Sequence, residues 1–375
     1  MNSGKYIVWG TGWEAEQFFY QYHNKIEIIY FVDKFNYNRK FYGIDVKCPD
    51  KLRGGKILIA SSAYYGEIKK QLIEMGFEEY RDFTYCFNVD KKIAFINGNC
   101  HCDIIKSYLC TSKEFAKKYV FGAFPLIHEN KAYDEKVLEY CDLFIYQDIR
   151  KESSVDYKYS EEYMLPRLKE ECVKICVPNL YGFPKALFYK NHMLSECGHK
   201  VSGGRYNPFL YCEEIIDECI QHGESFEKIC TRLKEEFVEE REIIARFRKD
   251  RERILEREKG WDVKISDYIF ENYQTTQLFY DVAHPTNFLL KEISNRILVN
   301  LGIEGKVSDD IKGSLNCYEV PVYDCIKDAL GIQWSNSFLR ERMENTASFV
   351  LTETKMDWRE YVKEYIWWRY GKEAV

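Results

Sequence analysis

The chain has 375 residues, a length that suggests two domains or three. Its composition, 46% hydrophobic and 30% charged, excludes a disordered chain, because enough apolar side chains are present to form real cores. The 54 Lys and Arg residues against 60 Asp and Glu residues give a net charge of −6, which argues against a nucleic-acid binder.

The sequence also indicates where the protein works. No apolar run approaches the ~20 residues that a membrane-spanning helix needs, so no integral membrane segment is expected. The first residues lead into a strand pattern without the apolar region of an export signal. The 14 cysteines have irregular spacings, and a chain of this length does not need disulfide staples. We therefore expect a cytoplasmic protein with reduced thiols.

Two groups of cysteines raise the question of a metal site. They are Cys100-His101-Cys102 and Cys172-x-x-x-Cys176. Neither has a paired C-x-x-C spacing, and neither has an evident second half elsewhere in the chain. We expect no metal site, and most of the thiols should pack as small apolar side chains.

Residues 1–90 begin like a dinucleotide-binding unit. A strand pattern is followed by a turn with Gly10 and Gly12, a helix pattern with Ala15 in the third glycine position, and an apolar run that ends at Asp33. Glycines let the backbone approach a pyrophosphate, the helix N-terminus faces the anion, and Asp33 could accept hydrogen bonds from a ribose. The pattern predicts a nucleotide or nucleotide-sugar site at Gly10, Gly12 and Asp33.

A simpler interpretation of this unit stays open. A further strand pattern at residues 56–62 precedes a helix pattern, but about 90 residues is short for a full dinucleotide site, which uses two mononucleotide halves. The glycines could then serve only the turn. The unit resembles the small Rossmann-like modules attached to sugar-modifying transferases, in which nucleotide binding is not assured.

The strand–turn–helix pattern restarts at Lys91. The strand KKIAFIN is followed by the sharp turn Gly98-Asn99-Cys100 and by a helix pattern from His101. A cysteine at a helix N-terminus is suited to chemistry, because the thiolate is the nucleophile and the helix dipole stabilises it. The backbone N–H groups beside it can also receive an oxyanion.

Two polar residues stand at the ends of the following predicted strands. Gln147 ends the strand LFIYQDI, where its amide could donate to an oxyanion or could cap the strand. Asn179 follows the strand ICV, at the edge where open α/β sheets bind ligands, although an Asn that only forms a turn is the other interpretation.

Residues 225–258 carry the longest helical pattern. Apolar residues recur at three, four or seven positions and mark one face. An amphipathic helix with salt-bridged flanks explains the pattern. The alternative uses its basic cluster, which includes Arg246 and Arg248, because guanidinium groups bind phosphates.

A candidate base for the thiol lies far downstream. In the segment LFYDVAHPTNFLL, Asp281 and His284 are three residues apart, so a tight turn lets the carboxylate orient the imidazole. Pro285 keeps His284 out of the helical region, and a helix is predicted just after it. Cys100, His284 and Asp281 together supply the nucleophile, base and orienting group that acyl transfer requires.

These motifs resemble two related groups of enzymes. The turn after the first strand and the D-x-x-H-P element before the last helix resemble the SGNH hydrolases, although Gly98-Asn99-Cys100 stands where that family has Gly-Asp-Ser. Together with LFIYQDI, the same segments resemble more closely the WcbI family of polysaccharide-biosynthesis acetyltransferases. The resemblance spans about residues 91–330.

The resemblance implies an acetyltransferase that takes acetyl-CoA as donor and a sugar or glycan hydroxyl as acceptor in capsular-polysaccharide synthesis. Cys100 would carry the acyl group, or would only shape the site while His284 deprotonates the sugar. The further site residues that we predict are Gly98, Asn99, Gln147 and Asn179 for oxyanion and substrate, and Arg246 and Arg248 for the phosphates of CoA.

The predicted fold is α/β. A Rossmann-like domain at residues 1–90 precedes an SGNH- or flavodoxin-like α/β/α domain with helical additions at residues 91–335. Residues 336–375 form a predicted helical extension, whose aromatics pack on the body, form a homo-oligomer interface or serve as a carbohydrate platform. The rival functions are a carbohydrate esterase of the same layout and a non-catalytic nucleotide-binding module in glycan assembly.

Overall fold

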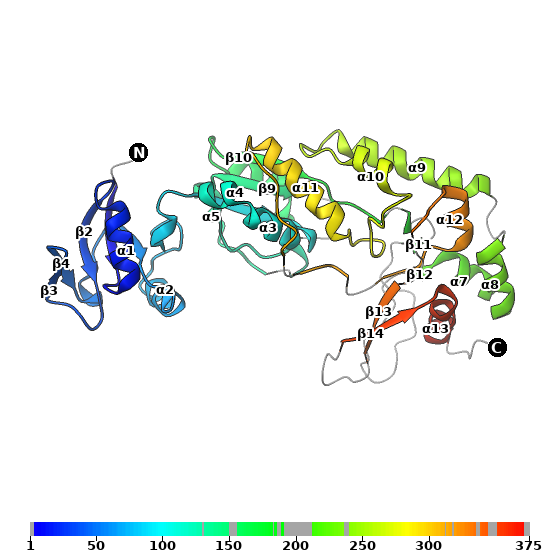
Figure 1. Cartoon of the computed structure of the whole chain (residues 1–375), viewed down its shortest axis with the longest axis horizontal. Helices are drawn as coiled ribbons and strands as arrows, with labels where there is room; N and C mark the ends of the chain where they lie inside the picture. The colour runs from blue at the N-terminus through cyan, green and yellow to red at the C-terminus, as the bar shows by residue number, and fades with distance from the viewer. Residues whose placement is uncertain are drawn as a thin grey trace.

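The structure is a computed structural model in which two parallel-rich sheets follow each other along the chain (Figure 1). It describes residues 4–129, 131–149, 156–182, 184–185, 189–190, 212–235, 240–311, 313–316, 319–334, 338–343 and 351–370.

The first sheet lies at one end of the molecule and is built from residues 5–85 (Figure 1). Its strand order is β3-β4-β2-β1-β5-β6, and all neighbours are parallel except β3 and β4. The predicted strands, helices and Rossmann-like arrangement are confirmed. The bounds are β1 Lys5–Trp9, α1 Trp13–Tyr22, β2 Glu27–Val32, β3 Arg39–Phe41, β4 Ile44–Lys47, β5 Lys56–Ile59, α2 Tyr65–Glu74 and β6 Phe83–Tyr85.

Successive side chains along the central strand of this sheet point to opposite faces and pack in two separate cores. In β1, Ile7 and Trp9 pack with α2 on one face, whereas Val8 packs with α1 on the other. Strands buried on both faces need nearly continuous apolar runs, which is why KYIVW and KILI show little polar alternation. The strand order reverses between β1 and β5, and Gly10 follows β1 at that point.

The second sheet is fully parallel, with the order β10-β9-β7-β8. The chain leaves β7 for β8 on one side and then crosses to β9 on the other, so the order reverses between β7 and β9. The carboxyl ends of strands at such a reversal form a crevice for ligands. The bounds are β7 Lys92–Asn97, α3 His101–Thr111, α4 Lys113–Lys118, β8 Tyr119–Phe121, α5 Val137–Tyr140, β9 Leu143–Gln147, α6 Glu161–Met164, β10 Val173–Val177 and α11 Asn287–Asn300.

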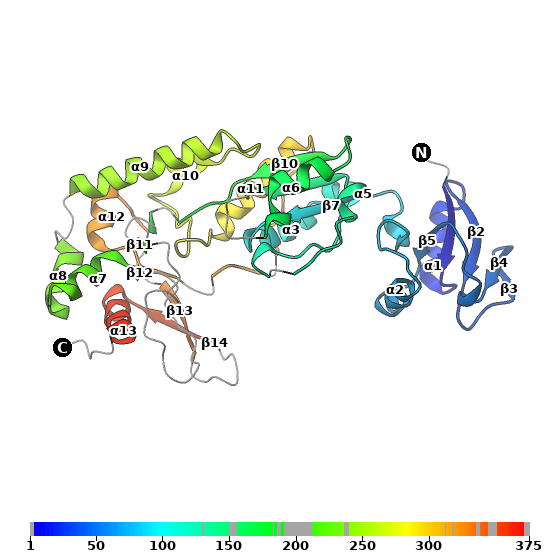
Figure 2. The ribbon, with the colours of Figure 1, turned by 180° about the vertical axis from the view of Figure 1, so that it is seen from behind.

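Helices cover both faces of the second sheet (Figures 1 and 2). Ala94 and Ile96 of β7 face the core that contains α3 and α11, which pack against each other. Phe95, between them in sequence, faces a separate core with α5 and α6. The predicted α/β/α architecture is therefore confirmed.

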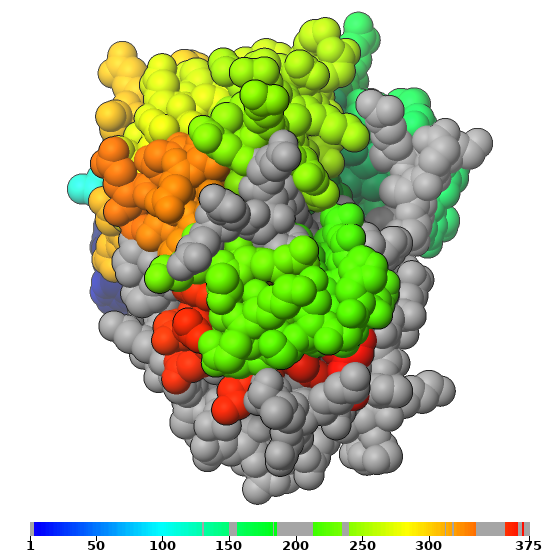
Figure 3. Space-filling view, turned by 90° about the vertical axis from the view of Figure 1, so that its right-hand side faces the viewer, coloured from blue at the N-terminus to red at the C-terminus, as the bar shows by residue number. Residues whose placement is uncertain are grey.

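Further helices gather at the other end of the molecule, where α12 contacts both α8 and α9 and α13 contacts α8 (Figure 3). The remaining elements are β11 Tyr189–Lys190, β12 Cys212–Glu213, α7 Glu214–Gln221, α8 Phe226–Glu235, α9 Glu240–Glu258, α10 Ser266–Asn272, α12 Asp324–Leu330, β13 Phe338–Met343, β14 Leu351–Met356 and α13 Trp358–Tyr370. Short 3₁₀ helices span Pro49–Lys51, Cys86–Asn88, Ile127–Glu129, Tyr157–Tyr159 and Leu165–Arg167. None of the helices in the described ranges is long and apolar enough to cross a bilayer.

The C-terminal segment corrects the sequence prediction. Residues 336–375 are not a purely helical extension, because β13 and β14 pair as antiparallel strands before α13 begins. The periodicity of each segment did not reveal this, since a strand is stabilised by hydrogen bonds and side-chain packing to its neighbouring strand. Within the predicted helix at 225–258 the structure gives two helices, α8 and α9, with residues 236–239 outside the described part.

The two sheets are linked by contacts near the end of the first one. The Tyr80 hydroxyl donates to the carbonyl oxygen of Phe121 (3.2 Å), and the Tyr140 hydroxyl donates to that of Glu79 (3.3 Å). The segment after α2 therefore packs on the edge of the second sheet.

The two glycines of the first turn differ in backbone conformation and in the space around them, so their alanine variants form a matched pair. Gly10 has φ +123°, and a Cβ there would lie 2.8 Å from the Ala60 carbonyl oxygen, whereas a Cβ at Gly12 would meet nothing within 4 Å. We expect Gly10→Ala to destabilise the protein by about 1–3 kcal/mol. Gly12→Ala should cost less than about 1 kcal/mol. Urea denaturation of both variants measures this, and equal losses would contradict the assigned role of Gly10.

Candidate active site

The site begins at the turn between β7 and α3. Cys100 is the N-cap residue of α3 and is half-buried. Gly98 makes the turn possible, because a Cβ at that position would overlap the Cys102 sulfur and the Gln147 side chain. The sequence therefore places the thiol at a helix N-terminus, where the dipole favours the thiolate.

The second part of the site is the loop before α11. The fully buried Asp281 accepts hydrogen bonds from the backbone N–H groups of Ala283 (2.7 Å) and His284 (2.8 Å) through Oδ1. Its Oδ2 lies 2.6 Å from His284 Nδ1. The imidazole is thus held with Nε2 directed away from the carboxylate, as an acid–base histidine requires.

The structure brings the two parts together across 184 positions of sequence, and Cys100 and His284 interact directly through their side chains. Burial disfavours a charged imidazole, but hydrogen bonds and charge at Asp281 and Cys100 outweigh it and raise the pKa of His284 to about 10. The imidazole therefore holds its proton at neutral pH, so a positive charge lies beside the Cys100 sulfur.

The Asp281–His284 loop is held from a second side by the segment after β10. The N–H of Gly182 donates to the Val282 carbonyl oxygen (2.5 Å), and a Cβ at Gly182 would overlap the Asp281 carbonyl. The buried Lys185 donates to the Tyr280 carbonyl oxygen (2.7 Å). Burial lowers the pKa of Lys185 to about 8, although the carboxylate of Glu319, 3.8 Å away, favours its charge.

Side-chain amides organise the turn that carries Cys100. Gln147 Oε1 accepts the backbone N–H of Asn99 (2.9 Å). Asn99 Nδ2 donates to Asn179 Oδ1 (3.1 Å), and Asn99 Oδ1 accepts the backbone N–H of His101 (3.0 Å). The ends of β7, β9 and β10 are thereby linked in one network at the point where the strand order reverses.

The predicted residues fall into two groups. The structure gathers at the second sheet those predicted for the acyl-transfer chemistry itself. The residues predicted for cofactor binding lie on other elements, the loops of the first sheet and helix α9. The gathered residues are Gly98, Asn99, Cys100, Gln147, Asn179, Asp281 and His284, and the separate ones are Gly10, Gly12, Asp33, Arg246 and Arg248.

In the first domain, the residues of the glycine turn bind each other. The Thr11 hydroxyl donates to Asp33 Oδ2 (2.6 Å), and Asp33 Oδ1 accepts two backbone N–H groups of the following turn. These bonds lower the pKa of Asp33 against the opposing effect of burial. In the first turn of α1, Glu14 accepts the N–H of Ser62 (2.6 Å). A carboxylate thus already lies at the helix N-terminus where a pyrophosphate would bind.

The arginines of α9 differ in their distance from the site. Arg246 pairs with Glu242 (2.9 Å) and Glu214 (3.2 Å). About three turns further along, or roughly 16 Å, Arg257 pairs with Asp148 (3.1 Å), the residue after Gln147. The end of α9 near Arg257 is therefore the one that approaches the site.

Sequence reasoning missed two residues of the site. His101 is buried, and its Nε2 lies 2.6 Å from the Ala283 carbonyl oxygen. Its position directly after Cys100 was the available signal. Lys185 gave no signal in the sequence, because its contacts depend on how it packs against the loop at 280–284.

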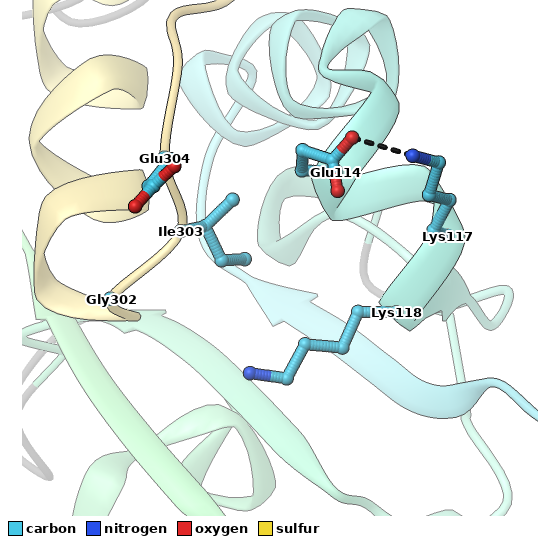
Figure 4. A pocket seen from close by; sticks show the side chains of 6 residues that line it. All are labelled: Glu114, Lys117, Lys118, Gly302, Ile303 and Glu304. Atoms are coloured by element: carbon cyan, nitrogen blue, oxygen red, sulfur yellow. Dashed lines mark hydrogen bonds and ion pairs between the residues drawn. The ribbon is translucent and has the colours of Figure 1, made fainter.

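One further feature, a pocket, lies apart from the triad. A surface pocket of about 440 Å³ lies between α4 and the segment that follows α11 (Figure 4). It contains none of the triad residues, and its lining is Glu114, Lys117, Lys118, Gly302, Ile303 and Glu304.

Among the residues that the structure describes, no three His, Cys, Asp or Glu side chains gather as a metal ion would require.

Comparisons with known proteins extend this description. Residues 93–306 match the family described as polysaccharide biosynthesis enzyme WcbI, and residues 2–83 match a family described as C2185-like, N-terminal. A solved structure of WcbI, a novel polysaccharide biosynthesis enzyme, superposes with a TM-score of 0.57 at 19% identity, covering 74% of this chain and 89% of that one. It is described as the native protein without a disulfide bond between coenzyme A and a cysteine. No curated protein matches this chain.

The raised pKa of His284 predicts a pH dependence of stability. Between the unfolded value near 6.5 and the folded value of about 10, the native state holds a proton that the unfolded state has released. The stabilisation by His284 is therefore complete below pH 6.5 and is lost as the pH rises through about 10. We expect the difference in unfolding free energy between wild type and His284→Gln to shrink over this range in urea denaturation. A difference independent of pH would contradict the assigned ion pair.

Proposed function

The chain belongs to the WcbI family of polysaccharide biosynthesis enzymes, and from this premise we propose that it is an O-acetyltransferase. It moves an acetyl group from acetyl-CoA to a sugar hydroxyl in the synthesis of capsular or other surface polysaccharide. The observation that carries the proposal is the convergence of Cys100, His284 and Asp281 at the carboxyl ends of β7 and β9.

Coenzyme A is the donor that the site suits. The solved WcbI structure is described in terms of coenzyme A and a cysteine, and its fold is shared by this chain. In the present protein Cys100 is half-buried at a helix N-terminus, so a thioester carbonyl can approach it from the crevice. We do not assign the phosphates of CoA to Arg246 alone, because Glu242 and Glu214 already pair with it. Arg248 is exposed and stays a proposed phosphate contact.

The transfer proceeds in two balanced steps. The Cys100 thiolate attacks the acetyl carbonyl carbon, and the C–S bond to CoA breaks while His284 gives its proton to the departing sulfur. His284 Nε2, now neutral, then takes the proton of the sugar hydroxyl, whose oxygen attacks the Cys100 thioester. The C–S bond to Cys100 breaks, and the thiolate–imidazolium pair is restored.

Developing negative charge on the acetyl oxygen requires hydrogen-bond donors. Gln147 is buried, its Oε1 accepts the N–H of Asn99, and its Nε2 lies 3.4 Å from the Pro178 carbonyl oxygen, so we assign it to the organisation of the turn rather than to an oxyanion. We assign the donor role to the backbone N–H of Cys100 and to the side-chain amide of Asn179, whose Oδ1 is fixed by Asn99.

We propose the boundaries 1–90, 91–335 and 336–375 for the three units, the second of which carries the chemistry.

A mechanism that needs a free thiol at Cys100 suits a reducing compartment, so we place the reaction in the cytoplasm. Nucleotide binding at Gly10, Gly12 and Asp33 would require a ligand to displace the existing contacts of Glu14 and Asp33.

Replacement of the thiol tests the covalent step. With labelled acetyl-CoA and a glycan acceptor, Cys100→Ala should abolish transfer, while Cys100→Ser should keep part of it because a hydroxyl can still carry the acetyl group. His284→Ala should lower the rate by about 10²–10⁴-fold. Cys110→Ser, on the exposed side of α3, is the control and should leave transfer unchanged. Equal rates for wild type, Cys100→Ser and Cys100→Ala would argue for direct transfer with His284 as base.

Ligand binding separates the proposal from its rivals. A thermal shift with CoA or acetyl-CoA is expected, because a ligand that binds only the native state raises the melting temperature. Release of acetate from an acetylated sugar without CoA would indicate the esterase. A shift with nucleotides alone, together with no transfer by the wild type, would indicate a non-catalytic module.

A further inference from the structure

The nucleophile and the base each have a neighbour in sequence, and these neighbours are hydrogen-bonded to each other. His101 follows Cys100, and Ala283 precedes His284. His101 Nε2 lies 2.6 Å from the Ala283 carbonyl oxygen. One hydrogen bond therefore connects the first turn of α3 directly to the loop that carries the base.

The surroundings of His101 fix its protonation and its tautomer. Burial lowers the pKa of His101 to about 4, with His284 acting in the same direction and the Ala283 carbonyl and Asp281 opposing. The imidazole is thus neutral at physiological pH. Because a carbonyl oxygen only accepts hydrogen bonds, Nε2 carries the proton and Nδ1 carries the lone pair.

The lone pair of Nδ1 faces a donor. Gln147 Nε2 lies 3.5 Å from His101 Nδ1 and 3.4 Å from the Pro178 carbonyl oxygen. Through Oε1 the same amide accepts the N–H of Asn99. The orientation of His101 is therefore set by the ends of β9 and β10 and by the turn after β7.

From this geometry we infer that His101 is a positioning residue that sets the separation and orientation of the Cys100 sulfur and the His284 imidazole. It acts through the Ala283 carbonyl and does not touch the reacting atoms. The inference rests on the proposed function, in which these two side chains react as a pair.

The hydrogen bond from His101 to Ala283 depends on the chemistry of the side chain at position 101 as well as on its position. Gly182 and Lys185 hold the base loop from the β10 side, and neither fixes it to α3. An apolar side chain at position 101 could fill the same buried space, but it would leave the Ala283 carbonyl without this donor. A neutral imidazole supplies the donor without adding a second positive charge beside the His284 imidazolium. Misplacement of a reacting group by about 1 Å can cost on the order of 10²-fold in rate.

The test uses the thiol itself as reporter. The rate of iodoacetamide alkylation at Cys100 is followed from pH 5.5 to 9 by mass spectrometry of the Cys100 peptide, in the full-length protein. Variants are His101→Gln, whose amide can still donate to Ala283, and His101→Phe, which cannot. Cys102→Ala, an equally buried change in the same turn of α3, is the control for packing loss.

We expect nearly constant alkylation between pH 6 and 8 in wild type, in Cys102→Ala and, to a large extent, in His101→Gln. In His101→Phe the thiol should lose its imidazolium partner, so its rate should fall roughly tenfold per pH unit below the ordinary thiol value near 8.5. Circular dichroism verifies that each variant is folded.

The outcomes separate this inference from the proposed function. If wild-type Cys100 itself behaves as an ordinary thiol, the reacting pair and the inference both fail. If wild type keeps the flat profile and folded His101→Phe keeps it too, only the positioning role is overturned. If Cys102→Ala loses the profile to the same extent as His101→Phe, general packing explains the effect and the inference is wrong.

Discussion

The contact on which the site depends is the one between the buried Asp281 carboxylate and His284. An isolated carboxylate in an apolar interior is costly, so it is stable there only with hydrogen-bond donors around it. The imidazole and the N–H groups of Ala283 and His284 supply them. These hydrogen bonds stabilise the buried charge of Asp281 and also orient the His284 imidazole toward Cys100.

The parallel sheet gives this contact its partner. Strands β7, β9 and β10 end at one edge, and a polar residue at the end of each joins the hydrogen-bond network beside Cys100. Gly98 and Gly182 allow the backbone of the site to pack closely where any side chain would overlap its neighbours. The polar groups there are held by other protein groups, which would lower the reorganisation that the proposed acetyl transfer requires.

The two sheets show how a shared topology can end in different chemistry. Both reverse their strand order beside a glycine turn, which is where α/β folds bind ligands. In the second sheet this point presents a thiol and an imidazole. In the first, Thr11 binds Asp33 and Glu14 binds Ser62, so the polar groups of the turn are already engaged with one another. Fold alone therefore does not assign a ligand to the first domain.

The sequence by itself determined the α/β class, most strands and helices of both sheets, and the chemical identity of Cys100, Asp281 and His284, because apolar runs, glycine turns and a D-x-x-H-P element are local signals. Only the tertiary structure decided that residues 100 and 284 meet, that Gln147 serves the turn, that His101 and Lys185 belong to the site, and that residues 338–356 contain paired strands. The first three depend on contacts between distant segments, and the paired strands depend on hydrogen bonds from one strand to the next. A pattern within a single segment does not encode the energy of such contacts.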